Sequence, residues 1–340
     1  MIRGLSADRG EASPCIVVAL GGNALSGPGE LGDVYSQFAH TRESLSPIVA
    51  LAREGWRIAV VHGNGPQIGD ELLRHELAHH ERPMFPLGVL VASTAGWIGY
   101  MIQQSLQNAL RRAGVRRHTI TVITQVLVSP PPEGMDPIKP IGRSLDRDSA
   151  IRLRDEHGLP VAERDGKWRR LAPSPVPIGI VERDEIRVLV DSGVVVIAAG
   201  GGGTPAYRDP DGTFEGVDAV VDKDRAAQVL ADEIGADVLL IVTNVDGVYT
   251  GFGTPDEKLL RELKVDEARA LLEKGEFGRG SMAPKVEAAV AFVSGGKGRR
   301  AHIAALDKGL EAVNGQAGTV IVESSEAEQS SAPREAARPA

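Results

Sequence analysis

Residues 15–25 read CIVVALGGNAL, six apolar residues followed at once by a glycine pair. Two further runs have the same form: RIAVVH at 57–62 precedes Gly63-Asn64-Gly65, and VVVIAA at 194–199 precedes Gly200 to Gly203. Continuous apolar runs of this length, rich in β-branched residues, are typical of parallel strands buried on both faces. The pattern therefore predicts an α/β fold in which a glycine loop follows each of three strands.

Strand and helix patterns alternate along the rest of the chain. Further apolar runs at 119–128 and 237–243 complete the expected strands. Helical patterns are expected at 37–54, 67–81, 91–113, 182–192, 222–234, 265–273 and 284–294. This alternation favours a layered sheet with right-handed crossover connections. The segment 130–177 differs, because it is rich in Pro, Gly and Arg around a predicted hairpin at 159–172 with Asp165-Gly166 as its turn. We expect it to form an inserted lid.

Length and composition limit the domain count. The 340 residues, 42 % apolar and 25 % charged, suffice for one large α/β domain or two smaller ones. Both ends lack hydrophobic periodicity and are rich in small or charged residues. We therefore expect an ordered domain over 14–323 between disordered segments at 1–13 and 324–340.

Charge and cysteine content exclude several classes of protein. The formal charge of −8 gives no positive field for a nucleic-acid backbone or an anionic membrane. Cys15 is the single cysteine, so no internal disulfide can form, and Asp8 and Glu11 stand where a secretory signal needs an apolar core. We expect a cytoplasmic protein with a small-molecule or protein partner.

One uncharged stretch, from Pro83 to Leu110, is longer than a membrane-spanning helix requires. Glutamine, serine, threonine and asparagine residues interrupt it, and two glycines lie inside it. We therefore expect a helix buried in the core or in a subunit interface rather than a membrane span.

The glycine loops and the lysines point to phosphate chemistry. Loops after parallel strands meet at one sheet edge, where glycine lets backbone N–H groups approach phosphate or carboxylate oxygens. The GNGPQIG segment at 63–69 meets neither the Walker nor the dinucleotide spacing. Lysine is absent before Lys139; Lys223 lies between two aspartates and Lys285 opens a helix. Compact cations at such positions suit phosphoryl transfer.

A competing metal motif occurs at 75–79, where His75-Glu76-Leu77-Ala78-His79 matches H-E-x-x-H. On a helix these residues could hold zinc, with Glu76 as general base. No Asp or Glu follows between Arg82 and Pro132 as a nearby third ligand, and Pro83 ends the helix. A polar helix face is the preferred interpretation, and a zinc hydrolase is the alternative.

From about Ile16 to Val322 the chain resembles the carbamate kinases of the amino acid kinase superfamily. The motifs that carry the resemblance are, in order, VVALGGNAL (17–25), VVHGNGPQIG (60–69), GWIGYMIQQSL (96–106), TQVLV (124–128), KPIG (139–142), RRLAPSPVPIGIVE (169–182), AGGGGTPA (199–206), GVDAVVDKDRAA (216–227), VTNVDGVY (242–249), GSMAPKVEAAV (280–290) and GQAGTVI (315–321). The resemblance implies a three-layer αβα sandwich with a mainly parallel open sheet and a protruding lid subdomain.

The same resemblance implies an activity. Carbamoyl phosphate and ADP would give carbamate and ATP, in ATP-forming breakdown of arginine and carbamoyl phosphate, with Mg²⁺ carried by the nucleotide rather than by protein side chains. The protein would be a homodimer whose N-terminal half holds the carbamoyl group and whose C-terminal half holds the nucleotide.

Site residues follow from the matching motifs. The implied catalytic residues are Lys139, Lys285, Lys223, Asp224 and Asn23. The implied substrate-binding residues are Gly21, Gly22, Gly63, Asn64, Gly65, Gly201 and Gly202. The residues implied to lie near the nucleotide are Thr243, Asp246, Tyr249, Met282 and, again, Lys285.

Comparison within the superfamily favours carbamate kinase over the related kinases. Acetylglutamate kinases and aspartokinases resemble each other in a lysine just before the first glycine pair; here Ala19-Leu20 occupies that place, and Lys139 would supply the charge. The chain departs from the family pattern at Arg143-Ser144-Leu145, Val176 and Ala283. We expect these departures to affect lid packing and nucleotide affinity. A kinase for another small acid and a catalytically silent nucleotide-binding homologue stay open as alternatives.

Overall fold

An eight-stranded sheet forms the middle layer of the computed structural model, which describes residues 13–21, 25, 33–129, 135–164, 166–278 and 282–324. In spatial order its strands are β15 (Glu262–Lys264), β17 (Thr319–Val322), β16 (Arg300–Ala305), β12 (Val238–Thr243), β1 (Cys15–Leu20), β2 (Arg57–His62), β9 (Val195–Ile197) and β3 (Thr119–Thr121). β16 and β17 run antiparallel, and the other neighbours pair parallel. The predictions for the termini, apart from residues 13 and 324, lie outside the described residues.

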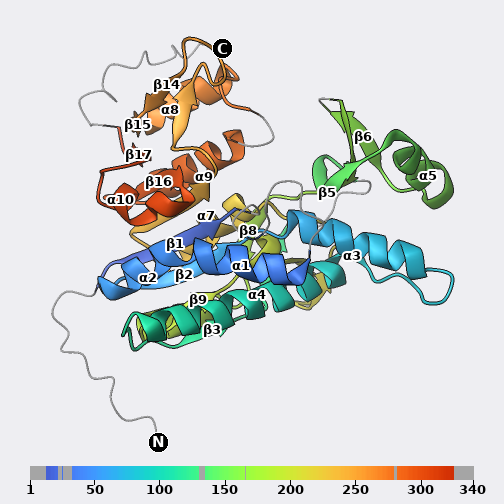
Figure 1. The fold of residues 1–340 in the computed structure, drawn as a ribbon, viewed down its shortest axis with the longest axis horizontal. Coiled ribbons are helices and arrows are strands. Elements are labelled where there is room, and N and C mark those ends of the chain that lie inside the picture. The colour runs from blue at the N-terminus through green and yellow to red at the C-terminus, as the bar shows by residue number, and fades with distance from the viewer. Residues whose placement is uncertain are drawn as a thin grey trace, which may run out of the picture.

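Helices cover both faces of this sheet (Figure 1). Successive strand residues point to opposite faces, so Val17 and Ala19 join one core while Ile16 and Val18 join the other. The first core is closed by α6 (Arg183–Asp191), α7 (Lys223–Glu233), α8 (Val265–Glu273) and α9 (Ala283–Ser294). The second is closed by α1 (Val34–Ser44), α2 (Ser46–Arg53), α4 (Leu87–Arg112) and α10 (Gly309–Val313). The predicted three-layer αβα sandwich is confirmed.

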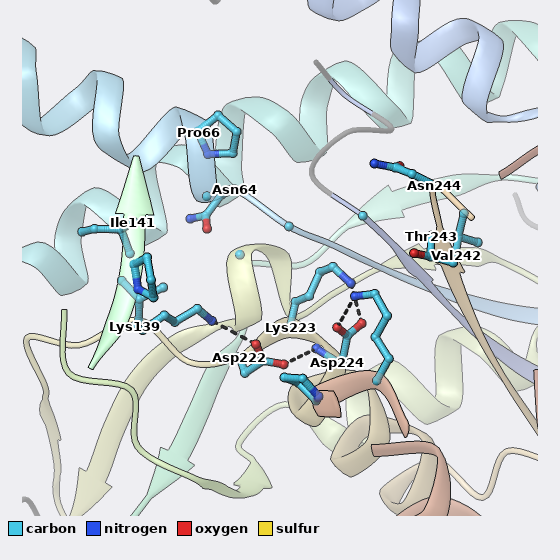
Figure 2. Close-up of a pocket in the computed structure, with 18 residues that line it drawn as sticks. Asn64, Pro66, Lys139, Ile141, Asp222, Lys223, Asp224, Val242, Thr243 and Asn244 are labelled. Carbon is cyan, nitrogen blue, oxygen red and sulfur yellow. Dashed lines mark hydrogen bonds and ion pairs between the residues drawn. The ribbon is translucent and has the colours of Figure 1, made fainter. Parts of the chain in front are cut away.

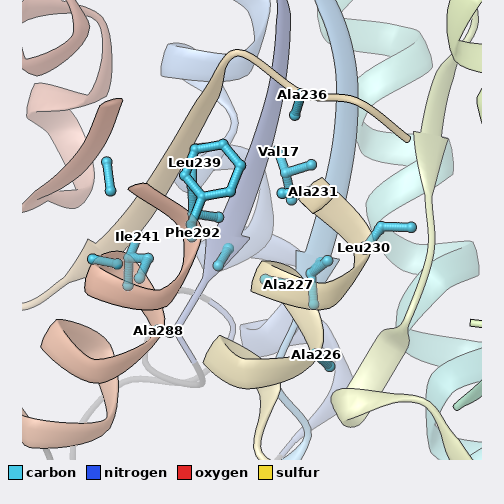
Figure 3. Packing of buried hydrophobic residues seen from close by; sticks show 14 of the residues in the cluster. Val17, Ala226, Ala227, Leu230, Ala231, Ala236, Leu239, Ile241, Ala288 and Phe292 are labelled. Carbon is cyan, nitrogen blue, oxygen red and sulfur yellow. The ribbon is translucent and has the colours of Figure 1, made fainter. Parts of the chain in front are cut away.

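Small side chains bring α7 close to the sheet. Ala227 and Ala231 are fully buried in the same core as Val17 of β1, while the ring of Phe292 from α9 lies beside Leu239 of β12 (Figure 3). Alanine leaves the helix free to approach the strand closely, whereas the phenylalanine ring fills space between α9 and the sheet. The N-terminus of α7 is thereby fixed at the carboxyl edge of the sheet.

The run at 119–128, predicted as one strand, forms two strands in different sheets. After β3 the chain leaves the main sheet, and β4 (Gln125–Val128) joins a second sheet. The other strands of that sheet are β8 (Pro177–Ile180), β10 (Thr204–Arg208) and β11 (Phe214–Gly216). At the bend the Thr124 hydroxyl donates to the Val122 carbonyl at 2.9 Å and accepts from the Ala199 amide at 2.9 Å. Such side-chain bonds to the backbone compete with a regular ladder.

The helical pattern at 37–54 likewise forms two helices, α1 and α2, which meet at Leu45. Pro47 lies in the first turn of α2. Proline has no N–H to continue an existing helix but is well suited to start one, so a new helix begins there. The other predicted helices are present close to their expected bounds, including α3 (Gly65–Ala78).

Residues 139–172 contain a small separate sheet, which lies beside α3 and apart from the main sheet (Figure 1). Its strands, in spatial order, are β5 (Lys139–Leu145), β7 (Lys167–Ala172) and β6 (Val161–Arg164). β6 and β7 pair antiparallel, as the predicted hairpin requires. The helix α5 (Arg147–His157) follows β5; Asp146 caps its start, and Gly158 at φ 63° ends it. A separate hairpin of β13 (Val248–Thr250) and β14 (Lys258–Leu260) follows β12.

The uncharged stretch forms α4, which buries Ile98, Ile102 and Leu106 in the second core. Its expected burial in the core is confirmed. In the part of the chain that the structure describes, no helix is both long and apolar enough to cross a membrane.

Candidate active site

A cavity of about 340 Å³ opens at the carboxyl edge of the main sheet. Its walls include Gly21 after β1, Gly63 and Gly65 after β2, and Gly201 after β9, so the three glycine loops meet there. The lining is completed by Asn64, Pro66, Lys139, Pro140, Ile141, Val220, Asp222, Lys223, Asp224, Val242, Thr243, Asn244, Pro284 and Lys285. Residues from both halves of the chain and from β5 thus share one space.

One buried carboxylate holds two of the lysines (Figure 2). Asp224, whose side chain is 4 % exposed, forms an ion pair with Lys223 through one oxygen and accepts from Nζ of Lys285 through the other at 2.8 Å. Burial lowers the pKa of the Lys223 ammonium, and the Asp224 carboxylate opposes part of that shift. Asp224 therefore fixes two cations, from α7 and α9, at the cavity wall.

The third lysine is held by the neighbouring aspartate. Nζ of Lys139 donates to the Val221 carbonyl at 2.9 Å and lies 3.3 Å from Oδ2 of Asp222. The other oxygen of Asp222 caps α7, accepting from the amides of Asp224 and Arg225. Burial raises the pKa of Asp222, but the ammonium groups of Lys139 and Lys223, together with hydrogen bonds from the Arg225 amide and from Lys139, lower it by more, so the net shift is downward.

The charges in the cavity do not balance. Among the described residues that line it, three ammonium groups face two carboxylates, and both carboxylates already pair with lysines. Backbone N–H groups of glycine loops and of helix N-termini add further positive potential. The cavity is therefore built for an anion, and its several separate cations suit a polyanion such as a phosphorylated ligand.

The loop after β9 packs closely against Asn64 and Val221. Gly201 has φ 71°, and a Cβ there would lie 2.4 Å from the side-chain nitrogen of Asn64. Gly202 has φ 96°, and its Cβ would lie 2.4 Å from the Val221 carbonyl oxygen. Asn64 is itself fixed, because it donates to the Thr94 hydroxyl at 2.9 Å. Glycine is required at both positions by backbone conformation and by space.

Some of the predicted site residues line the cavity, and others do not. Those that line the cavity are Gly21, Gly63, Asn64, Gly65, Lys139, Gly201, Lys223, Asp224, Thr243 and Lys285. Gly202 is buried behind the wall, and Asp246, Tyr249 and Met282 lie outside the lining. The Tyr249 hydroxyl is 3.5 Å from Asp246 Oδ2, so these two side chains lie together. Gly22 and Asn23 fall outside the described residues.

Sequence reasoning missed Asp222, which both caps α7 and pairs with Lys139. An aspartate immediately before a helical run is a helix-cap signal that could have identified the first role. The second role joins residues 83 positions apart and leaves no local pattern. Asn244 and Ile141 also line the cavity and were not predicted.

The structure contradicts the zinc interpretation of the H-E-x-x-H segment. Glu76 is buried and accepts from two guanidinium nitrogens of Arg170. His79 Nδ1 contacts the Glu76 carbonyl oxygen, and His75 packs against the Phe85 ring. Among the described residues no group of three His, Cys, Asp or Glu side chains is placed to hold a metal ion. Glu76 serves an ion pair, and the segment is a helix face.

Known proteins are similar to this chain in both sequence and fold. The profile of the amino acid kinase family matches residues 14–305. Carbamate kinase of Pyrococcus furiosus is 44 % identical over 311 residues, covering 90 % of this chain and 98 % of that protein, and the Halobacterium salinarum enzyme is 46 % identical over 316 residues, covering 91 % and 99 %. The solved structure of Giardia lamblia carbamate kinase bound to AMP-PNP has a TM-score of 0.84 at 36 % identity, covering 92 % of this chain and 99 % of that one.

Proposed function

Because the chain belongs to the amino acid kinase family, and within it to the carbamate kinases, we propose that its cavity transfers a phosphoryl group between carbamoyl phosphate and ADP, giving carbamate and ATP. The chain is a kinase, that is, a phosphotransferase. The observation that carries the proposal is the meeting of three lysines, from β5, α7 and α9, at one glycine-lined cavity.

The proposed chemistry needs no covalent enzyme intermediate. The carbamate oxygen that accepts or releases the phosphoryl group is already anionic, so no general base is required. The task of the protein is to align donor and acceptor and to neutralise charge on the planar phosphoryl group in the transition state. We assign this task to Lys139 and Lys285, with Lys223 at the phosphates and Asp224 orienting Lys223 and Lys285.

We assign the two sides of the cavity to the two substrates. The glycine loops with Asn64 would hold the carbamoyl group, since their backbone N–H groups suit carboxylate-like oxygens. The side of Thr243, with Asp246, Tyr249 and Met282 beyond it, would hold the nucleotide. Asp222 and Asp224 are already paired with lysines, so Mg²⁺ would be held by the nucleotide phosphates, as is usual for this ion. When bound, it supplies further neutralisation of phosphate charge.

The proposal is tested by measuring ATP formation from carbamoyl phosphate and MgADP with the purified protein. Removing one preorganised cation costs about 10² in rate or more, so we expect Lys139→Ala and Lys285→Ala each to lower kcat by at least that factor. Lys308→Ala is the matched control, because Lys308 is half-exposed and pairs with surface carboxylates at 3.9–4.0 Å. Its turnover should equal that of the wild type.

Three outcomes would contradict the proposal. Turnover that survives in Lys139→Ala would remove this lysine from the mechanism. Binding of ADP without turnover of carbamoyl phosphate, followed by turnover of another acyl phosphate, would assign the cavity to a different small acid. Binding without any turnover would favour the silent homologue.

We also propose that the protein acts as a homodimer in the cytoplasm. The outer face of α4 exposes Tyr100 by 56 % and Val89 by 48 %, and no charged residue lies between Pro83 and Leu110. An uncharged helix face with exposed large side chains is suited to a subunit interface. Sedimentation should give a dimer for the wild type and a monomer for Tyr100→Asp.

A further inference from the structure

A buried ion pair joins the β5–β7–β6 sheet to α3. Arg170 of β7 donates to both carboxylate oxygens of Glu76 on α3, with Nε 3.1 Å from Oε1, and each side chain is 6 % exposed. The bidentate geometry fixes the orientation of both groups. A buried pair of this kind is a weak source of net stability, but removing one partner leaves the other charge buried without compensation. The pair therefore opposes separation of the sheet from α3.

Next to this ion pair the two backbones touch. A Cβ at Gly69 of α3 would lie 2.2 Å from Cα of Gly142 in β5, and one at Gly142 would lie 2.9 Å from Cα of Gly69. Two glycines facing each other let helix and strand approach more closely than any side chain would permit. A second ion pair lies alongside, because Arg143 donates to both oxygens of Asp70, at 3.1 and 3.4 Å. Arg143 is one of the residues at which the chain departs from the family pattern.

An apolar cluster completes the contact. Ile141 of β5 is buried together with Ile68 and Leu72 of α3 and Leu90 of α4. Ile68, Leu72 and Glu76 are spaced four residues apart, so they share one face of α3 with Gly69, and Asp70 lies to one side of that face. The small sheet therefore contacts α3 from Ile68 to Glu76. We call this contact the α3–β5 joint, meaning the pairs Glu76–Arg170, Gly69–Gly142 and Asp70–Arg143 with the cluster around Ile141.

The joint lies next to a catalytic lysine. Lys139 begins β5, and in the antiparallel register Ile141 is opposite Arg170 while Lys139 is opposite Ala172. Lys139 is thus two residues along β5 from Ile141, the residue opposite the buried Arg170. Any tilt of β5 against α3 moves Lys139 relative to Asn64 and Gly65, which α3 holds at its own N-terminus.

We propose that Glu76 and Gly69 are positioning residues that set the place of Lys139 in the cavity through the α3–β5 joint. The proposal rests on the proposed phosphoryl transfer, in which Lys139 contacts the reacting group. A misplacement of about 1 Å can cost on the order of 10²-fold in rate. We expect loosening of the joint to lower kcat while leaving ADP affinity unchanged, because the nucleotide side of the cavity is built from other elements.

The first test compares Glu76→Gln with Glu71→Gln. Glu71 is on the same helix and pairs with Arg74 within one turn, so the control makes the same chemical change without touching β5. We expect kcat to fall at least ~10-fold in Glu76→Gln and to stay at the wild-type value in Glu71→Gln. Glu76→Gln combined with Lys139→Ala should be no slower than Lys139→Ala alone. An equal further loss in that double variant would show that Glu76 does not act through Lys139.

A second variant separates positioning from stability. Gly69 has ordinary helical backbone, so Gly69→Ala favours the helix by about 1 kcal/mol while its Cβ wedges α3 away from Gly142. Gly96→Ala in α4 is the control, since its Cβ would make an ordinary contact at 3.7 Å with Ile123. We expect Gly69→Ala to lose kcat and Gly96→Ala to keep it. Wild-type kcat in Gly69→Ala would overturn the proposal.

Amide hydrogen exchange of β5 and β7 gives a readout that is independent of catalysis. These amides should exchange faster in Glu76→Gln and Gly69→Ala than in the wild type, and at the wild-type rate in both controls. Unchanged exchange in Glu76→Gln would show that Glu76 does not hold β5 and β7 against α3, and it would overturn the proposal. Absence of carbamoyl phosphate turnover in the wild type would instead overturn the proposed function, so the two failures are distinguishable.

Discussion

Replacing Asp224 by asparagine removes the carboxylate that separates two ammonium groups. Lys285 lies 2.8 Å from one of its oxygens, and Lys223 contacts the other. At an effective dielectric constant of about 20, unit charges 2.8 Å apart attract by about 6 kcal/mol. Desolvation of the buried carboxylate, which is 4 % exposed, offsets part of this attraction. Breaking such a pair by removing one partner typically costs about 3–5 kcal/mol.

We therefore expect Asp224→Asn to lower the free energy of unfolding by about 4 kcal/mol. A chain of 340 residues has an unfolding entropy of about 0.7 kcal/mol/K, which converts this loss into a Tm lower by about 6 °C. Calorimetry and urea titration measure both quantities. Asp184→Asn is the control, because Asp184 pairs with Arg187 on the surface and is 61 % exposed. Loss of such an exposed pair costs less than about 1 kcal/mol.

The same substitution should change the pH dependence of turnover. Burial already lowers the pKa of Lys223, and Asp224 opposes that shift. Without the carboxylate the pKa falls further, so Lys223 loses its proton at a lower pH and the rate declines on the alkaline side earlier than in the wild type. An unfolding free energy within about 0.5 kcal/mol of the wild type, together with an unchanged pH–rate profile, would refute this account of the lysine cluster.

Two further predictions follow from the described geometry. Gly201→Val places a side chain at φ 71° against Asn64, so carbamoyl phosphate turnover should be lost while ADP binding, measured by calorimetry, is kept; loss of both would indicate misfolding. Burial lowers the pKa of His62 and His302 to about 4, below the ordinary value of 6.5. The unfolded chain therefore binds protons more readily, and stability present above pH 6.5 should be lost between pH 6.5 and 4, by on the order of 3 kcal/mol per ring. Urea titrations should show a flatter dependence of stability on pH for His302→Leu, which removes a ring whose two nitrogens have no hydrogen-bond partner among the described residues. An equally steep dependence would show that His302 is not a source of the pH effect.

The parallel sheet could be predicted because its cause is local. A strand buried on both faces must be largely apolar: β1 is apolar at all six positions, β2 over 58–61 and β12 over 238–242. The glycine loops could be predicted because their cause is also local: Gly201 has φ 71°, a conformation that favours glycine over other residues. Because lysine is scarce in the chain, Lys139, Lys223 and Lys285 could be predicted as site residues, and all three line the cavity.

What sequence could not predict depends on partners distant along the chain. The run 119–128 divides into two strands near Thr124, whose hydroxyl accepts a hydrogen bond from the amide of Ala199, 75 residues away. Glu76 illustrates the same limit, because its partner Arg170 is 94 residues away. Within residues 75–79 the local pattern matched a zinc motif, and nothing local distinguished a metal ligand from half of an ion pair.

The pairing of the lysines explains how three cations can share a cavity before any substrate arrives. Asp222 commits one oxygen to the α7 amides and the other to Lys139, so this carboxylate is fixed by the helix it caps. Asp224 lies in the first turn of the same helix. The cations are therefore placed by rigid groups before binding, and little reorganisation is needed when charge develops on a transferring phosphoryl group. Of these three lysines, Lys139 is the one that reaches the array from a separate sheet, which is why its placement depends on the α3–β5 joint, whereas that of Lys223 and Lys285 depends on the packing of α7 and α9.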